Sequence, residues 1–109
     1  MFGETPDGFS TITPEEAKAL MDTQDVVILD VREPHEFAMG HVPGAINVPM
    51  GEITLGRVLP QAPDLKKTVL VYCRSGRRSD ISGRIMAQSG YHDVRNFLGV
   101  IQWPFELVR

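Results

Sequence analysis

The chain has 109 residues, a formal net charge of −3 and 42% hydrophobic residues, which is typical of one soluble globular domain. The negative charge argues against a nucleic-acid or anionic-membrane partner, and no apolar run approaches the ~20 residues that a membrane helix needs. The only cysteine, Cys73, excludes an internal disulfide. It fits a reducing compartment, and residues 1–7 lack the regions of a signal peptide, so we expect a cytoplasmic protein.

Helical and strand patterns alternate along the chain. Thr13 can cap a helix that starts at Pro14, and Glu16 stands where a capping box needs it. The β-branched runs 26–31 and 68–72 are continuous, which predicts strands buried on both faces. In chain order we expect a strand over 10–12, the helix from 14, a strand over 26–31, a helical turn over 34–37, a strand over 45–48, a helix over 52–59, a strand over 68–72, a helix over 79–89, a strand over 94–97 and a final helix through Ile101, Trp103 and Phe105.

This alternation predicts an α/β domain with a central, mainly parallel sheet. We expect residues 1–9 to be a flexible N-terminal tail and residues 10–109 to form a single domain. In such sheets, ligands bind beyond the carboxyl ends of the strands. Cys73 comes directly after the strong run 68–72, so the sheet should present the only cysteine at its ligand-binding edge.

One short segment combines the cysteine with three arginines. We name it the cysteine loop, and it consists of Cys73, Arg74, Ser75, Gly76, Arg77 and Arg78. A loop between a strand and a helix directs backbone N–H groups and the positive end of the helix dipole at one spot. These groups and the guanidinium charges favour a thiolate, so we expect a reactive cysteine rather than a buried structural one. Ser75 and Ser79 can donate hydroxyl hydrogen bonds, and Ser79, which follows the loop, can equally cap the helix.

Three blocks of the chain resemble the rhodanese family of sulfurtransferases in order and spacing. They are DVREPHEF and GHVPGAINVP within 30–49, VYCRSGRRS at 71–79, and GY, LG and the tryptophan within 90–103. The resemblance implies a three-layer, single-domain fold whose five-stranded parallel sheet is flanked by helices. It also implies that Cys73 carries sulfane sulfur as a persulfide, that Arg78 closes the cysteine loop, and that Asp30 and Arg32 form a structural pair nearby.

The chain departs from the family pattern at two places. Gly99 is followed by Val100 where the family usually has a second glycine. We expect this β-branched residue to shift the final helix or to narrow the mouth of the pocket. Ser82 and Gly83 replace the usual pair of alanines, and they keep the small size that lets the helix lie close to the sheet.

The expected function is the transfer of sulfane sulfur from a small anionic donor such as thiosulfate to cyanide, a thiol or an acceptor protein. The chemistry needs no cofactor and no metal. Arg74 and Arg77 are expected to face solvent and to steer anions or partner proteins. A non-catalytic or sulfur-carrier module is the main alternative. A cysteine phosphatase on the same fold is less favoured, because four residues separate Cys73 from Arg78, whereas phosphatase loops have five.

Overall fold

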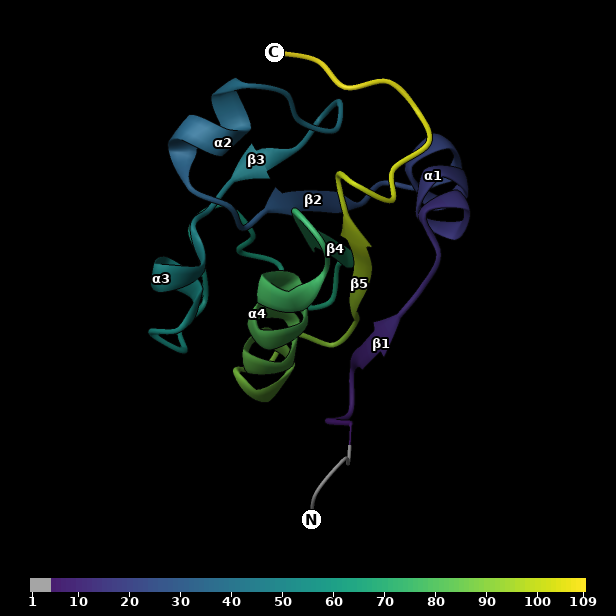
Figure 1. The fold of residues 1–109 in the computed structure, drawn as a ribbon. Coiled ribbons are helices and arrows are strands. Elements are labelled where there is room, and N and C mark those ends of the chain that lie inside the picture. Colours follow the sequence, from purple (N-terminus) through teal and green to yellow (C-terminus); the bar gives the residue numbers. More distant parts are fainter. Residues whose placement is uncertain (1–4) are drawn as a thin grey trace.

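A computed structural model describes residues 5–109 of the chain (Figure 1). Its strands are β1 (Phe9–Thr11), β2 (Val27–Asp30), β3 (Ile46–Asn47), β4 (Val69–Cys73) and β5 (Val94–Gly99), and its helices are α1 (Pro14–Thr23), α2 (Pro34–Ala38), α3 (Met50–Ile53) and α4 (Arg77–Gln88). The five strands form one sheet in the order β1-β5-β4-β2-β3, and every neighbouring pair is parallel. The predicted α/β fold with a parallel five-stranded sheet is therefore confirmed.

The sheet is the middle of three layers, and the side chains of its central strand β4 point alternately into the cores on its two faces. Val69, Val71 and Cys73 face a hydrophobic core that includes residues of α3 and α4, whereas Leu70 and Tyr72 face a second core that includes residues of α1. All five side chains are buried, as expected for a strand covered on both faces. The alternation places the sulfur of Cys73 on the α4 side of the sheet.

Two local devices predicted from the sequence are present. The Thr13 hydroxyl accepts a hydrogen bond from the Glu16 N–H, and the Glu16 carboxylate accepts one from the Thr13 N–H, both at 3.0 Å. This reciprocal capping box starts α1. Within α4, a Cβ atom on Gly83 would collide with the ring of Phe9. The glycine therefore lets α4 lie directly against β1.

Three element boundaries differ from the expected ones. Strand β1 begins at Phe9, inside the expected tail, and the Phe9 ring is buried against the sheet. Helix α3 ends before Gly56, whose φ of +70° leaves the helical region, so the helix expected over 52–59 is wrong. Helix α4 begins at Arg77 because Gly76, at φ +104°, occupies the N-cap. Ser79 is therefore not the cap of that helix.

The final helix expected through Ile101 is also absent. The chain forms only a turn after Gly99, because Pro104 has no N–H to continue a helix and disfavours helical backbone at the residue before it. Val100 packs against the core on the α1 side of the sheet. It therefore lies on the face opposite the sulfur, and the expected effects of this valine on a final helix and on the pocket mouth are wrong.

The C-terminal segment crosses the molecule between α1 and α2, where it is yellow in Figure 1. Val108 and His41 exchange two backbone hydrogen bonds of 2.8 Å in an antiparallel bridge. The bridge ties the end of the chain to the loop before β3. Within residues 5–109, every helix is too short or too polar to cross a membrane.

Candidate active site

The cysteine loop connects the carboxyl end of β4 to the first turn of α4, and it wraps around its own sulfur. The Gly76 N–H donates a hydrogen bond of 3.1 Å to Cys73 Sγ. The Ser79 Oγ lies 3.4 Å from the same sulfur atom. Cys73 is only 1% exposed, so the sulfur forms the floor of the loop. The left-handed backbone of Gly76 makes the tight turn that aims its N–H at the sulfur.

Two opposing effects set the acidity of this thiol. Burial of the sulfur raises the pKa of Cys73, because a charged atom loses hydration. Hydrogen bonds from the Ser79 hydroxyl and from the N–H groups of the loop lower it. The hydrogen bonds outweigh burial, and the pKa of Cys73 lies below its ordinary value. The site therefore favours a thiolate without a neighbouring general base.

The end of β5 supports the loop from behind. Gly99 lies opposite Cys73 in the sheet, and a Cβ atom on Gly99 would overlap the carbonyl of Arg74. The Val100 N–H donates to the Cys73 carbonyl at 3.0 Å, and the Ile101 N–H donates to the Arg74 carbonyl at 3.1 Å. The glycine at this position thus allows the two backbones to approach closely enough for these bonds.

The three arginines of the loop occupy different environments. Arg78 makes a bidentate ion pair with Glu36 of α2, with N–O distances of 2.7 and 2.9 Å. This pair lowers the pKa of Glu36 to about 2 and raises the pKa of Arg78. Arg74 and Arg77 are exposed, and neither side chain has an ion-pair partner within residues 5–109. Two guanidinium groups are thus free to meet an anion.

Asp30 and Arg32 lie at the carboxyl end of β2, beside β4. The Arg32 Nη2 is 2.7 Å from the Asp30 carboxylate and also donates to the Gly40 carbonyl at 2.7 Å. Both side chains are buried. Asn47 donates to the carbonyls of Asp30 and Arg32 at 3.0 and 2.9 Å. This buried network fixes the end of β2 and the following loop. The charges of Asp30 and Arg32 neutralise each other within it.

Sequence reasoning assigned no role to two residues that contact the loop. Glu36 holds Arg78, and Asn96 of β5 accepts a 2.7 Å hydrogen bond from the Ser79 hydroxyl. A signal existed for each. Three clustered arginines call for a counter-charge, and a polar residue in the middle of a buried strand usually has a specific partner. Which partner each has follows only from the fold.

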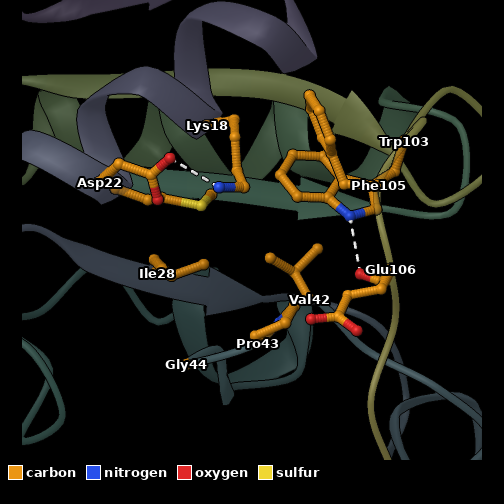
Figure 2. Close-up of a pocket in the computed structure, with 10 residues that line it drawn as sticks. Lys18, Asp22, Ile28, Val42, Pro43, Gly44, Trp103, Phe105 and Glu106 are labelled. Carbon is orange, nitrogen blue, oxygen red and sulfur yellow. Dashed lines mark hydrogen bonds and ion pairs between the residues drawn. The ribbon is translucent and has the colours of Figure 1, made fainter.

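The cavity in Figure 2 lies away from the cysteine loop. It has a volume of about 360 Å³. Its lining includes Ile28, Val42 and Trp103, which belong to the core on the α1 side of the sheet. Figure 2 shows the Trp103 and Phe105 rings on one side of this space. Outside this cavity, the His41 ring stacks on the Phe37 ring with their centroids 3.7 Å apart. The His41 Nδ1 lies 2.9 Å from the Phe37 carbonyl oxygen.

Comparison with known proteins assigns the chain to a family. The model of the rhodanese-like domain matches residues 13–103. The chain belongs to the rhodanese-like domain family. It is 40% identical over 72 residues to the thiosulfate sulfurtransferase PspE of Escherichia coli, an alignment that covers 66% of this chain and 68% of PspE. It is 33% identical over 104 residues to the putative sulfur carrier protein YrkF of Bacillus subtilis, covering 92% of this chain and 54% of YrkF.

Solved structures show the same fold. The human single-domain sulfurtransferase TSTD1 superposes with a TM-score of 0.77 at 25% identity, covering 85% of this chain and 93% of TSTD1. A rhodanese with anions from E. coli superposes with a TM-score of 0.71 at 34% identity, covering 78% of this chain and 99% of that protein. The rhodanese-like sulfurtransferases are therefore the class to which this fold belongs.

Proposed function

We propose that the protein is a sulfurtransferase that carries sulfane sulfur as a persulfide on Cys73. In the first half-reaction the Cys73 thiolate attacks the outer sulfur of a donor such as thiosulfate. A bond forms between Sγ and that sulfur, and the donor S–S bond breaks with its electron pair leaving on sulfite. In the second half-reaction a nucleophile attacks the outer sulfur of the persulfide, and the electron pair of the broken bond returns to Sγ. No proton, oxidant or cofactor is consumed.

One observation carries this proposal. The only cysteine of the chain lies at the floor of a loop that directs hydrogen-bond donors at its sulfur, with Gly76 N at 3.1 Å and Ser79 Oγ at 3.4 Å. Such donors stabilise negative charge on sulfur in the thiolate and in the departing group. The exposed guanidinium groups of Arg74 and Arg77 match the tetrahedral oxyanion end of a donor such as thiosulfate.

The sulfur acceptor is an external molecule. With one cysteine in the chain, the persulfide meets no second thiol of the same chain that could resolve it. Cyanide, a small thiol or a thiol on an acceptor protein can attack the outer sulfur. The single cysteine fits a reducing compartment, so a cytoplasmic location stays a prediction. The choice of a thiol as the sulfur acceptor is also a prediction.

Phosphate-ester hydrolysis is the enzymatic alternative. Four residues separate Cys73 from Arg78, and Arg78 is engaged by Glu36 rather than free above the sulfur. The ring of donors is correspondingly tight around a sulfur that is 1% exposed. A single sulfur atom fits this floor better than a phosphoryl group does. An aryl phosphate assay should give no Cys73-dependent product.

A sulfur carrier that accepts sulfur but does not turn over is the non-enzymatic alternative, and the name of YrkF describes that role in a relative. The two readings differ in their kinetics. A sulfurtransferase should release many equivalents of thiocyanate from thiosulfate and cyanide, whereas a carrier should release at most one equivalent per chain.

The test is therefore a steady-state assay in which thiosulfate and cyanide are varied together. Double displacement at one nucleophile predicts parallel lines in the double-reciprocal plot. Cys73→Ser should abolish thiocyanate formation while the circular dichroism spectrum and the unfolding midpoint stay close to those of the wild type. Activity that survives Cys73→Ser would overturn the mechanism.

A further inference from the structure

Asn96 is a buried polar residue in the middle of strand β5, and both ends of its amide contact the active-site elements. It is 2% exposed. Its Oδ1 accepts from the Leu98 N–H at 3.0 Å, and its Nδ2 donates to the Gly76 carbonyl at 3.2 Å. The N–H can only donate and the carbonyl can only accept, so these two contacts determine the orientation of the amide. The Ser79 hydroxyl, 2.7 Å from Oδ1, must then donate to it.

The Ser79 hydroxyl has one proton and several acceptors. Asn96 Oδ1 lies at 2.7 Å, the Leu98 carbonyl at 3.3 Å and Cys73 Sγ at 3.4 Å. A hydroxyl has one O–H to donate, so it cannot donate fully to the amide and to the sulfur at once. The contact to Asn96 Oδ1 is the shortest, so the hydroxyl donates to the amide while Sγ is an uncharged thiol, and a lone pair of the hydroxyl then faces the sulfur. A thiolate would be repelled by that lone pair unless the hydroxyl rotates.

We propose that Asn96 is a positioning residue for the Ser79 hydroxyl. Asn96 Oδ1 accepts the hydrogen bond of this hydroxyl while Cys73 Sγ is uncharged, and the hydroxyl turns to donate to Sγ when that atom becomes an anion. The movement is a rotation about the Cβ–Oγ bond of Ser79, and no covalent bond is made or broken. Asn96 stays in place, because Leu98 and Gly76 hold the other positions of its amide.

This inference rests on the proposed function for its role in turnover. In a persulfide the negative charge is on the outer sulfur, so the inner Sγ is uncharged and the Ser79 proton lies on Asn96. When a nucleophile takes the outer sulfur, the electron pair of the S–S bond returns to Sγ. The hydroxyl then rotates to Sγ and stabilises the leaving thiolate. Ser79 thereby serves two charge states of one atom without a proton transfer.

Other charges on the elements around the sulfur stay constant in the variants below. They form ion pairs on α4, α2, β2 and β5 or lie exposed on the loop: Arg78 with Glu36, Arg32 with Asp30, Arg84 with Asp80, Arg95 with Asp93, and the exposed Arg74 and Arg77. Differences among the variants therefore report on Ser79 and Asn96.

The test is a double-mutant cycle on the Cys73 thiol, read from the pH dependence of alkylation rather than from sulfur transfer. Asn96→Asp puts a carboxylate in the acceptor position, which holds the Ser79 proton more firmly. We expect Asn96→Asp to slow alkylation near neutral pH by about tenfold, equivalent to a thiol pKa about one pH unit higher. In a Ser79→Ala background the same substitution should slow it by less than about threefold.

If Asn96→Asp slows alkylation by the same factor in the wild-type and Ser79→Ala backgrounds, the proposal is overturned. Such a result would mean that the new carboxylate charge acts on the sulfur directly. Ser82→Ala is the matched control. Ser82 is a buried serine on the same helix, and its Oγ has no hydrogen-bond partner among residues 5–109. Its removal should leave the alkylation profile unchanged. Since alkylation needs no donor or acceptor substrate, the cycle can succeed or fail independently of the proposed sulfur transfer.

A second measurement avoids the risk that Asn96→Asp does not fold. In 15N-labelled wild-type protein, the side-chain amide signals of Asn96 should move with pH at the midpoint of the Cys73 thiol, because the hydrogen bond from Ser79 is lost as the thiolate forms. The same signals in Ser79→Ala should move severalfold less. Equal movement with and without the hydroxyl would contradict the rotation of Ser79.

Discussion

At the scale of single residues, the acidity of Cys73 depends on donors that belong to its own loop. Burial opposes ionisation, and a thiol that is 1% exposed would ordinarily stay protonated. The Gly76 N–H at 3.1 Å and the Ser79 hydroxyl at 3.4 Å reverse that preference. The nucleophile is thus activated by backbone geometry and one hydroxyl, and the exposed Arg74 and Arg77 are left for the sulfur donor.

The Glu36–Arg78 pair connects this loop to α2, and its contribution should depend on pH. Glu36→Gln keeps the hydrogen bond to the Glu33 N–H that caps α2 but removes the charge. We expect the loss to lower the free energy of unfolding near neutral pH by about 1 kcal/mol, since both partners are partly exposed.

The sign follows from the pKa of Glu36, which the Arg78 guanidinium lowers from 4.5 to about 2. A lowered carboxyl pKa stabilises the fold above the unfolded value and loses that contribution as pH falls through the folded one. Urea unfolding should therefore show a difference between wild type and Glu36→Gln near neutral pH that shrinks between pH 4.5 and about 2. A difference that stays constant over this range would contradict the assignment.

At the scale of elements, the site is made where the end of β5 meets the cysteine loop. The pairing of β4 with β5 shifts register between Val71 and Cys73, and Leu98 in this irregular stretch has φ +78°. Gly99 then comes close enough to the loop for the Val100 N–H to bond the Cys73 carbonyl at 3.0 Å. Backbone hydrogen bonds therefore hold the loop against the end of β5.

Gly99→Ala tests that support. The added Cβ would overlap the Arg74 carbonyl, which is backbone and cannot rotate away. We expect a loss of about 1–3 kcal/mol in unfolding free energy, as for overpacked sites, together with a marked loss of sulfur transfer. Gly51→Ala is the matched control, because a Cβ there would have no neighbour within 4 Å in the described part of the chain. Sulfur transfer by Gly99→Ala at the wild-type rate would contradict the role of this contact.

Sequence reasoning identified interactions between residues close together in the chain, and it missed those between residues far apart in the chain. The capping box of α1 was predictable because Thr13 and Glu16 are three positions apart. The bond between Arg78 and Glu36 spans 42 positions, and the one between Ser79 and Asn96 spans 17, so no local pattern indicated either pair. The loop could be located because strand, cysteine and glycine are adjacent. The residues that brace it are set by the order of strands in the sheet.

At the scale of the whole molecule, Arg74 and Arg77, which have no ion-pair partner among the described residues, form a positive patch on a chain whose net charge is −3. Such a local inversion of sign should attract small anions to the mouth of the loop. Arg74→Ala combined with Arg77→Ala should lower kcat/KM for thiosulfate more than for a neutral polysulfide. The defect should shrink as ionic strength rises, because salt screens exposed charges.

Arg57→Ala is the control for overall charge, since Arg57 is exposed and lies outside the cysteine loop. Arg57→Ala should change kcat/KM for thiosulfate and for the neutral polysulfide equally and only slightly. Equal losses for charged and neutral donors in the double variant would argue that these arginines support the loop rather than steer anions.

The central claim is that Cys73 accepts sulfur covalently, and intact-protein mass spectrometry tests it most directly. Incubation with thiosulfate should add about 32 Da, the mass of one sulfur atom, as expected for a covalent intermediate on one nucleophile. The adduct should disappear on treatment with cyanide and should be absent from Cys73→Ser. An unmodified wild-type mass with thiosulfate and with polysulfide, or an adduct of the same mass on Cys73→Ser, would contradict the account.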